Sequence, residues 1–347
     1  MLHGSMHHSR VNPTDTHESA QVFVPTRWKA PMSTDNAPHP HYDRLIATVR
    51  QLPPLRVAVV HPSNEPSLEA ALTSATMGLT VPVLVGPRAK IEAAAKSLGA
   101  SLEGIELIDA PHSHAAADKA VELARDGKVD AIMKGSLHTD ELMGAVVRRD
   151  GGLRTARRIS HCFVMDVPGH NQPLIISDAA INIAPTLEEK VDIVQNAIDL
   201  AHALRLSTVR VAILSAMETV NSKVPSTIDA AALCKMAERG QITGGVLDGP
   251  LAMDNAIDAE AARIKGIVSP VAGHADVLIA PDLDAGNMLS KSLTFLAGAY
   301  AAGIVLGAKV PIILTSRADS EPARLASCAV ATLLAQAARE GRIRAVG

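Results

Sequence analysis

Short apolar runs rich in Val and Ile alternate with longer amphipathic segments from residue 55 onward. Brief apolar runs bounded by turn residues are typical of buried strands, whereas longer segments with apolar positions three and four apart are typical of helices. The pattern predicts strands at 56–60, 81–85, 105–108, 131–133, 163–167, 174–176, 210–214, 245–247, 277–279 and 311–314. It predicts helices over 67–77, 90–98, 115–125, 187–204, 227–239 and 321–338. This alternation indicates an α/β fold with a mostly parallel sheet flanked by helices.

Two segments depart from this alternation. Residues 1–43 hold many Pro, Ser, Thr and Asn residues and no hydrophobic period, so they predict a disordered tail. The longest run of small and apolar residues covers 296–308 and is too short for a bilayer span, which needs about 20 residues. Because the run contains Gly298, Gly303 and Gly307, we expect a buried helix that leads into a turn.

Length and composition narrow the class of protein. The 347 residues suffice for two domains, and 47% apolar residues can fill two cores. A net charge of -3 and 2% aromatic residues give no basis for nucleic-acid or membrane partners. Three cysteines without a CxxC pair indicate a reducing compartment, and the N-terminus lacks signal-peptide features. We therefore expect a cytoplasmic protein.

Candidate chemistry is sought in the loops after strands, because ligands of parallel sheets collect at the carboxyl ends of strands and against helix N-termini. The loop 134–139 follows one predicted strand and offers Lys134, Ser136 and Thr139 as donors beside Gly135. A helix beginning near Asp140 adds its positive end, so the loop is a candidate phosphate site. An ordinary strand-to-helix turn with Thr139 as N-cap is the alternative.

A second loop is rich in arginine. The glycine pair 151–152 precedes Arg154 and lies among four further arginines: Arg148, Arg149, Arg157 and Arg158. Guanidinium groups beside a flexible glycine pair can clamp phosphate groups of a ligand. A solvated basic face explains the same residues equally well.

Two acidic loops lie at 248–255 and 281–287. The second contains Asp282 and Asn287 and is followed by Lys291, which makes these three residues candidates for a substrate cleft. Carboxylates at strand ends can hold a divalent metal, or they can orient neighbours by accepting backbone hydrogen bonds. The spacing matches no known metal site, so we expect no metal.

The most distinctive loop follows the strand predicted at 311–314. Ser316 and Arg317 stand where a buried strand ends, and Ser320 is a plausible N-cap with Glu321 and Pro322 in the first helical turn. An arginine there can bind phosphate through two parallel hydrogen bonds, with the hydroxyl of Ser316 beside it. Capping alone explains Ser320 but not the arginine.

Several motifs in one order carry a resemblance to a known family: KGSLHT, GGLRT, DAAINIAPTLEEKVDI, RGQITGGVLDGPLAMDNAI, KGIVSPVAGHADVL, PDLDAGNMLSK and LTSRADS. From about residue 45 onward the chain resembles the short form of the phosphate acetyltransferase and phosphate butyryltransferase family. The resemblance implies two α/β domains with a substrate cleft between them, and a homodimer. It places a discontinuous first domain at 44–154 plus 307–347 and a second domain at 155–306.

The resemblance also implies roles for individual residues. Ser316 corresponds to a serine that contacts the thiol region of coenzyme A, and Arg317 to an arginine that binds the phosphate of the acyl phosphate. The family has an aspartate assigned as base seven residues after the serine, where this chain has Ala323. Asp319 is the first substitute candidate for the base and Glu321 the second.

A further departure concerns positive charge. A family arginine in the helix after the KGSLHT-like motif corresponds here to Met143. Arg154 is the candidate that replaces its charge.

The implied reaction is the reversible conversion of acyl-CoA and phosphate into acyl phosphate and CoA. Acetyl is the preferred acyl group and butyryl the alternative. Coenzyme A enters as a substrate, and no tightly bound cofactor is expected. A dehydrogenase dependent on metal and NAD is a rival, because that class shares the two-domain architecture and also lacks the GxGxxG fingerprint absent here. A non-catalytic sensor of acyl phosphate or CoA is another, because Ala323 replaces the family's base.

Overall fold

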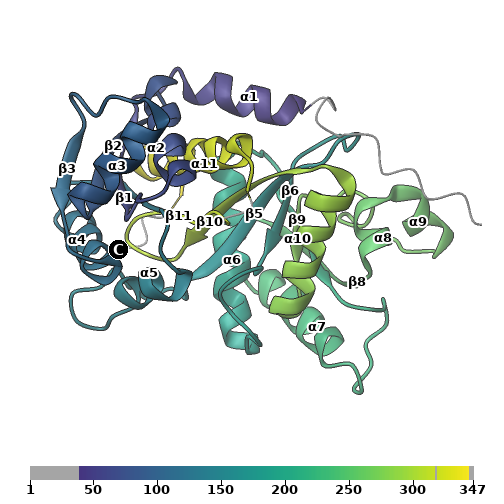
Figure 1. The fold of residues 1–347 in the computed structure, drawn as a ribbon. Helices are drawn as coiled ribbons and strands as arrows, with labels where there is room; N and C mark the ends of the chain where they lie inside the picture. The colour runs from purple at the N-terminus through teal and green to yellow at the C-terminus, as the bar shows by residue number, and fades with distance from the viewer. Residues whose placement is uncertain (1–38, 317–318, 344–347) are drawn as a thin grey trace, which may run out of the picture. The chain divides into compact units, whose positions relative to one another are not determined.

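A computed structural model describes residues 39–316 and 319–343. Their strands form one sheet in the order β3-β2-β1-β4-β11-β10-β5-β6-β9-β7-β8 (Figure 1). The strand bounds are β1 Leu55–Val60, β2 Thr80–Gly86, β3 Glu106–Asp109, β4 Ala131–Lys134, β5 Ser160–Asp166, β6 Leu174–Ser177, β7 Arg210–Leu214, β8 Val246–Leu251, β9 Val277–Ile279, β10 Tyr300–Leu306 and β11 Ile312–Ile313. Antiparallel pairing occurs between β10 and β11, β10 and β5, and β5 and β6, and the other described pairings are parallel. The predicted α/β class with a mostly parallel sheet is confirmed.

Helices connect most of these strands. Their bounds are α1 Pro40–Val49, α2 Glu65–Thr76, α3 Arg88–Leu98, α4 Ser113–Arg125, α5 Thr139–Val146, α6 Leu187–Ala203, α7 Pro225–Glu238, α8 Met253–Ile257, α9 Ala259–Ile264, α10 Leu283–Ala297 and α11 Glu321–Arg339. Among the described helices, none is long and apolar enough to cross a membrane.

One expectation for local structure was wrong, and a second was wrong only for its last residues. The run 296–308 does not form one buried helix: α10 ends at Ala297, Gly298 takes a left-handed φ of 70°, and β10 begins at Tyr300. A run of small apolar residues has no polar positions to reveal its period, so a buried strand and a buried helix look alike in it. The predicted tail 1–43 lies outside the described residues up to 38, and its last residues form the start of α1.

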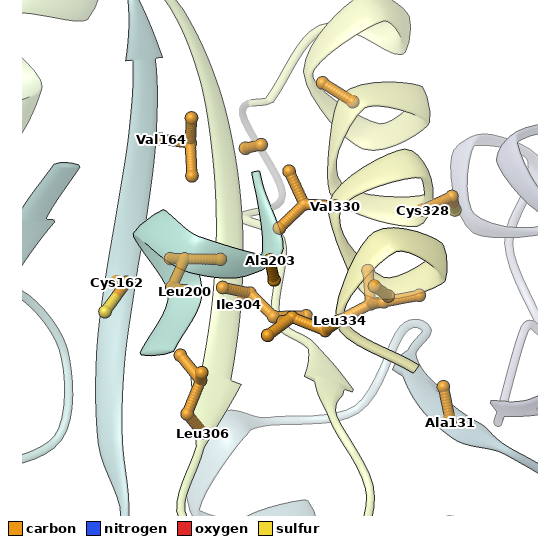
Figure 2. Close-up of a cluster of buried hydrophobic side chains, with 14 of the residues drawn as sticks. Ala131, Cys162, Val164, Leu200, Ala203, Ile304, Leu306, Cys328, Val330 and Leu334 are labelled. Carbon is orange, nitrogen blue, oxygen red and sulfur yellow. The ribbon is translucent and has the colours of Figure 1, made fainter. Parts of the chain in front are cut away.

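Alternate residues of each central strand point to opposite faces of the sheet. Val57 and Val59 of β1 belong to the cluster that includes α2, α6 and α11, whereas Ala58 and Val60 pack with α4 and α5. Figure 2 shows part of the first cluster, where Val330 and Leu334 of α11 gather with side chains of β5, β10 and α6. This packing fixes α11 on the sheet.

The two predicted domains contribute different parts of the sheet. The segments 44–154 and 307–347 supply β3, β2, β1, β4 and β11, which are neighbours in the strand order, and 155–306 supplies the other strands. The division into two domains with a cleft between them stays a prediction.

Candidate active site

Two of the predicted loops lie side by side because their strands are neighbours. β4 and β11 pair in parallel, with Ile132 opposite Ile312 and Met133 opposite Ile313. Their carboxyl ends therefore meet at one edge of the sheet, which brings the Lys134 loop next to the Ser316 loop although about 180 residues separate them in sequence.

A cavity of about 70 Å³ lies between these loops. The N-terminal turn of α2 and an arginine in the first turns of α11 close it, and both helices direct the positive end of their dipole to this edge. A water molecule takes up about 30 Å³ in the liquid, so the cavity has room for a small ion. Its lining residues are Asn64, Pro66, Ser67, Met133, Lys134, Gly135, Ser136, Thr315, Ser316 and Arg324.

Hydrogen bonds and a close backbone contact fix the conformation of the Lys134 loop. Lys134 is buried, and its Nζ donates hydrogen bonds to the carbonyl oxygens of Gly135 and Leu137 at 3.3 and 3.1 Å. The backbone N–H of Gly135 donates to the carbonyl oxygen of Val60 at 2.9 Å. A Cβ on Gly135 would lie 2.3 Å from that oxygen, so only glycine fits here and the next residue, Ser136, is placed at the cavity.

Ser136 belongs to a cluster that the sequence reasoning missed. Its Oγ donates to the carbonyl oxygen of His61 at 2.6 Å and lies 2.8 Å from Ser63 Oγ and 3.2 Å from His61 Nδ1. Burial and the charge of Lys90 lower the pKa of His61, while the charge of Glu141 opposes them. His61 is therefore neutral near pH 7. It follows β1 directly, so the rule that pointed to the other post-strand loops could have found it.

The Ser316 loop joins the candidate serine to the candidate base. Asp319 Oδ2 accepts a hydrogen bond of 2.6 Å from the backbone N–H of Ser316. Ser320 caps α11 by accepting from the N–H of Ala323 at 3.4 Å, as predicted, and Pro322 lies in the first turn. Arg317 lies outside the described residues.

Asp319 stands in a positive environment. Burial raises the pKa of its carboxyl, and the N–H of Ser316 together with the charges of Arg324, Lys291 and Lys134 oppose this rise. A carboxylate with a raised pKa accepts a proton more readily than an ordinary one. The structure thus brings together Lys134, Ser136, Ser316, Asp319 and the charge of Lys291, all of them predicted.

Arg324 is another residue of the cavity that the sequence reasoning missed. It lines the cavity, is 8% exposed, and its Nη1 donates to the carbonyl oxygen of Pro66 at 2.5 Å. A signal was present in the sequence, because Arg324 stands alone within a helical run of Ala, Leu, Cys and Val residues. Buried arginines are rare unless they interact with another polar group.

Glu321 and Thr139 are placed less favourably. Glu321 is exposed at the first position of α11. Burial raises the pKa of Tyr42 on α1, and the charge of Glu321 adds to this rise. Thr139 is the first residue of α5 and is half-buried. The N-cap of that helix is His138, whose N–H donates to Glu141 Oε2 at 2.8 Å, so the alternative of Thr139 as the cap was wrong.

Arg154 is not brought to the cavity. It forms an isolated antiparallel bridge with Ala308, beyond the carboxyl end of β10. Because β10 runs antiparallel to β11, that end lies at the edge of the sheet opposite to Ser316. Three neighbouring arginines form ion pairs with protein carboxylates: Arg148 with Asp118, Arg157 with Asp199 and Arg158 with Glu189.

The acidic loops serve local structure. Asp282 caps α10 by accepting from the N–H of Ala285 at 2.9 Å, and Asn287 donates to the carbonyl oxygen of Ala179 at 3.0 Å. The prediction of a loop over 248–255 was wrong in part, because β8 continues to Leu251 and α8 begins at Met253. Within the described residues, no group of three or more His, Cys, Asp or Glu side chains could hold a metal ion.

Comparisons with known proteins agree with the resemblance. Residues 114–332 match the family model described as phosphate acetyl/butaryl transferase. The chain is 65% identical over 305 residues to a phosphate acetyltransferase of Rhizobium meliloti (88% of this chain, 96% of the relative), and 40% identical over 294 residues to a phosphate butyryltransferase of Clostridium acetobutylicum (85% and 98%). A crystal structure of a branched-chain phosphotransacylase from Enterococcus faecalis superposes with a TM-score of 0.72 at 28% identity, covering 81% of this chain and 99% of that one. This chain therefore belongs to the phosphate acetyl/butyryl transferase family.

Proposed function

We propose that this protein is a phosphate acyltransferase that moves an acetyl group reversibly between coenzyme A and inorganic phosphate. The observation that carries the proposal is the cavity at which Ser316, Lys134 and Arg324 meet. Hydroxyl donors and two cations around a small cavity suit a phosphate group, and Asp319 beside it suits proton transfer. Acyl-CoA and phosphate are the substrates.

In the direction of acyl-CoA synthesis, the coenzyme A sulfur attacks the carbonyl carbon of the acyl phosphate. The carbon–sulfur bond forms, the carbon–oxygen bond to phosphate breaks, and phosphate leaves with the electron pair. An alkyl thiol like that of cysteine has a pKa of about 8.5, so removal of its proton by Asp319 assists attack near neutral pH. Arg317, Lys134 and Ser316 stabilise the charge that grows on the phosphate and the carbonyl oxygen. Holding both substrates in one cleft supplies orientation.

We assign the acyl group from the sequence identity of this chain to two named relatives. The relative at 65% identity is named an acetyltransferase and the relative at 40% a butyryltransferase. The test measures thiol release from acetyl-, propionyl- and butyryl-CoA in the presence of phosphate. We expect the highest kcat/KM with acetyl-CoA. A higher value with butyryl-CoA would instead make the protein a butyryltransferase.

The same assay separates the enzyme from its rivals. The dehydrogenase alternative is not favoured, because the relatives at 57–65% identity are named phosphate acetyltransferases. A change of absorbance at the nicotinamide band upon turnover would restore it. Thiol release from none of the three acyl-CoA substrates would favour the non-catalytic sensor of acyl phosphate or CoA.

We infer a two-domain arrangement around the site and a cytoplasmic location for the protein. Two domains form the cleft that holds the substrates. The first comprises 44–154 plus 307–347, and the second comprises 155–306. The protein acts in the cytoplasm, where its free cysteines, Cys162, Cys234 and Cys328, stay reduced.

A homodimer is also part of the proposal. On α10, Met288, Phe295 and Leu296 are 62%, 65% and 79% exposed and share one face of the helix by their spacing. A second copy of the chain covers this apolar face. Light scattering of the wild type and of Phe295→Asp tests it, with a dimer expected for the first and a monomer for the second.

A further inference from the structure

We propose that Arg324 binds the phosphate group of the acyl phosphate, in an anion subsite that it shares with Lys134. The inference rests on the proposed function and deepens it, because it names a residue that neither the predicted site nor the family resemblance assigned. It concerns the buried side of the cavity, whereas Ser316 stands at the exposed side.

Two buried cations in one small cavity carry the inference. Lys134 is 7% and Arg324 8% exposed, and both line the same cavity of about 70 Å³. Two like charges at one cavity repel each other, and an anion placed between them is attracted to both. Both charges also act on Asp319, as does the charge of Lys291. The cavity therefore favours an anionic ligand over a neutral or cationic one.

The geometry of Arg324 suits a phosphate. The hydrogen bond from Nη1 to the carbonyl oxygen of Pro66 joins the first turns of α11 and α2 and holds one end of the guanidinium. A buried guanidinium held at one end binds phosphate oxygens with less further loss of side-chain entropy than an exposed one. Ser67 and Ser136 line the same cavity, and their hydroxyls donate to Asn64 and to the carbonyl oxygen of His61. The donors to the anion are therefore the two cationic side chains.

Arg324 places a positive charge in the cavity, which neither Met143 nor Arg154 does. Met143 is buried in the apolar cluster around α4 and α5 and supplies no charge. Arg154, the replacement expected from sequence, lies at the opposite edge of the sheet. Arg324 lies in the cavity itself.

The experiment compares three variants with the wild type. Arg324→Met removes the charge and keeps much of the volume, and Arg324→Lys keeps the charge but loses the planar fork. Arg339→Met is the matched control, because Arg339 lies on the same helix but is exposed and pairs with Asp130. Three quantities are measured for each protein: the rise in melting temperature caused by inorganic phosphate, the KM for phosphate and the KM for acetyl-CoA.

We expect inorganic phosphate to stabilise the wild type and Arg339→Met equally, since a ligand that binds only the folded state raises its stability. Arg324→Met should lose most of this stabilisation and raise the KM for phosphate by about tenfold to a hundredfold, with little change in the KM for acetyl-CoA. Arg324→Lys should show a smaller rise and guards against misfolding of the methionine variant.

The outcomes separate the subsite from the activity. Wild-type phosphate stabilisation and phosphate KM in both Arg324 variants would overturn the subsite, as would a wild-type protein that phosphate does not stabilise. Phosphate stabilisation that depends on Arg324, in a protein that releases no thiol from any acyl-CoA, would support the subsite and overturn the proposed function.

Discussion

The carboxylate of Asp319 accepts a hydrogen bond from the backbone N–H of Ser316 at 2.6 Å. The bond ties the candidate base to the candidate serine within one loop, directly before the capped start of α11. Because α11 is packed on the sheet, the position of both residues depends on a rigid element. Their chemistry can be tested separately, since one contributes a carboxylate and the other a hydroxyl.

Replacing Asp319 with Asn should lower turnover by roughly a hundredfold, because the amide can still accept the N–H of Ser316 but cannot take a proton. The base must be ionised, so the wild-type rate should fall as the pH drops through the pKa of Asp319, which burial raises above its usual value of 3.8. Glu321→Gln is the matched control and should keep the wild-type profile. If neither variant alters the pH–rate profile, the base lies elsewhere.

The same substitution should stabilise the fold at pH 7. A pKa raised in the folded state means that the unfolded chain releases the proton of Asp319 more readily, so the carboxyl favours folding at low pH and this contribution is lost as the pH rises through the folded pKa. Asp319→Asn removes the half-buried charge and should melt at a higher temperature than the wild type near neutrality. A lower melting temperature would contradict the assigned burial.

Ser316→Ala should reduce turnover by about a hundredfold, because one donor to the growing charge is lost. Arg317→Ala should reduce turnover similarly and also raise the KM for phosphate. The control is Ser320→Ala, which removes the helix cap and should cost about 1 kcal/mol of stability with little effect on turnover. Unchanged kinetics in both Ser316→Ala and Arg317→Ala would remove the site assignment.

Gly135→Ala should destabilise the protein by about 1–3 kcal/mol and lower activity, because the new methyl group meets the carbonyl oxygen of Val60 at 2.3 Å and displaces Ser136. Gly144→Ala serves as control. Gly144 lies within α5 with open space around its Cβ position, so alanine there should raise stability by up to about 1 kcal/mol. Chemical denaturation measures both, and equal effects would contradict the role of Gly135.

His61 should make the protein sensitive to acid. Its pKa is lowered in the folded state by burial and by Lys90, against the opposing charge of Glu141, so the unfolded chain binds the proton more tightly. Its contribution to stability is therefore present above about pH 6.5 and is lost as the pH falls through the lowered pKa. In His61→Gln, the melting temperature should fall less between neutral and mildly acidic pH than in the wild type. An equal fall in both proteins would show that His61 is not responsible.

The sequence by itself determined most of the local structure and the chemistry of two loops. Val- and Ile-rich runs such as 210–214 became strands because a buried strand needs an apolar, β-branched surface. Ser320 became an N-cap because its hydroxyl satisfies an N–H of the first turn. Lys134 and Ser316 could be singled out because ligands collect where parallel strands end.

Only the tertiary structure decided which of these loops share a site. β4 and β11 are neighbours in the sheet although they are distant in sequence, and this pairing joins Lys134 to Ser316. The antiparallel course of β10 carries Arg154 to the other edge of the sheet, and α11 brings Arg324 into the cavity. Strand order depends on contacts between segments remote in sequence, which a local pattern of apolar and polar residues does not encode.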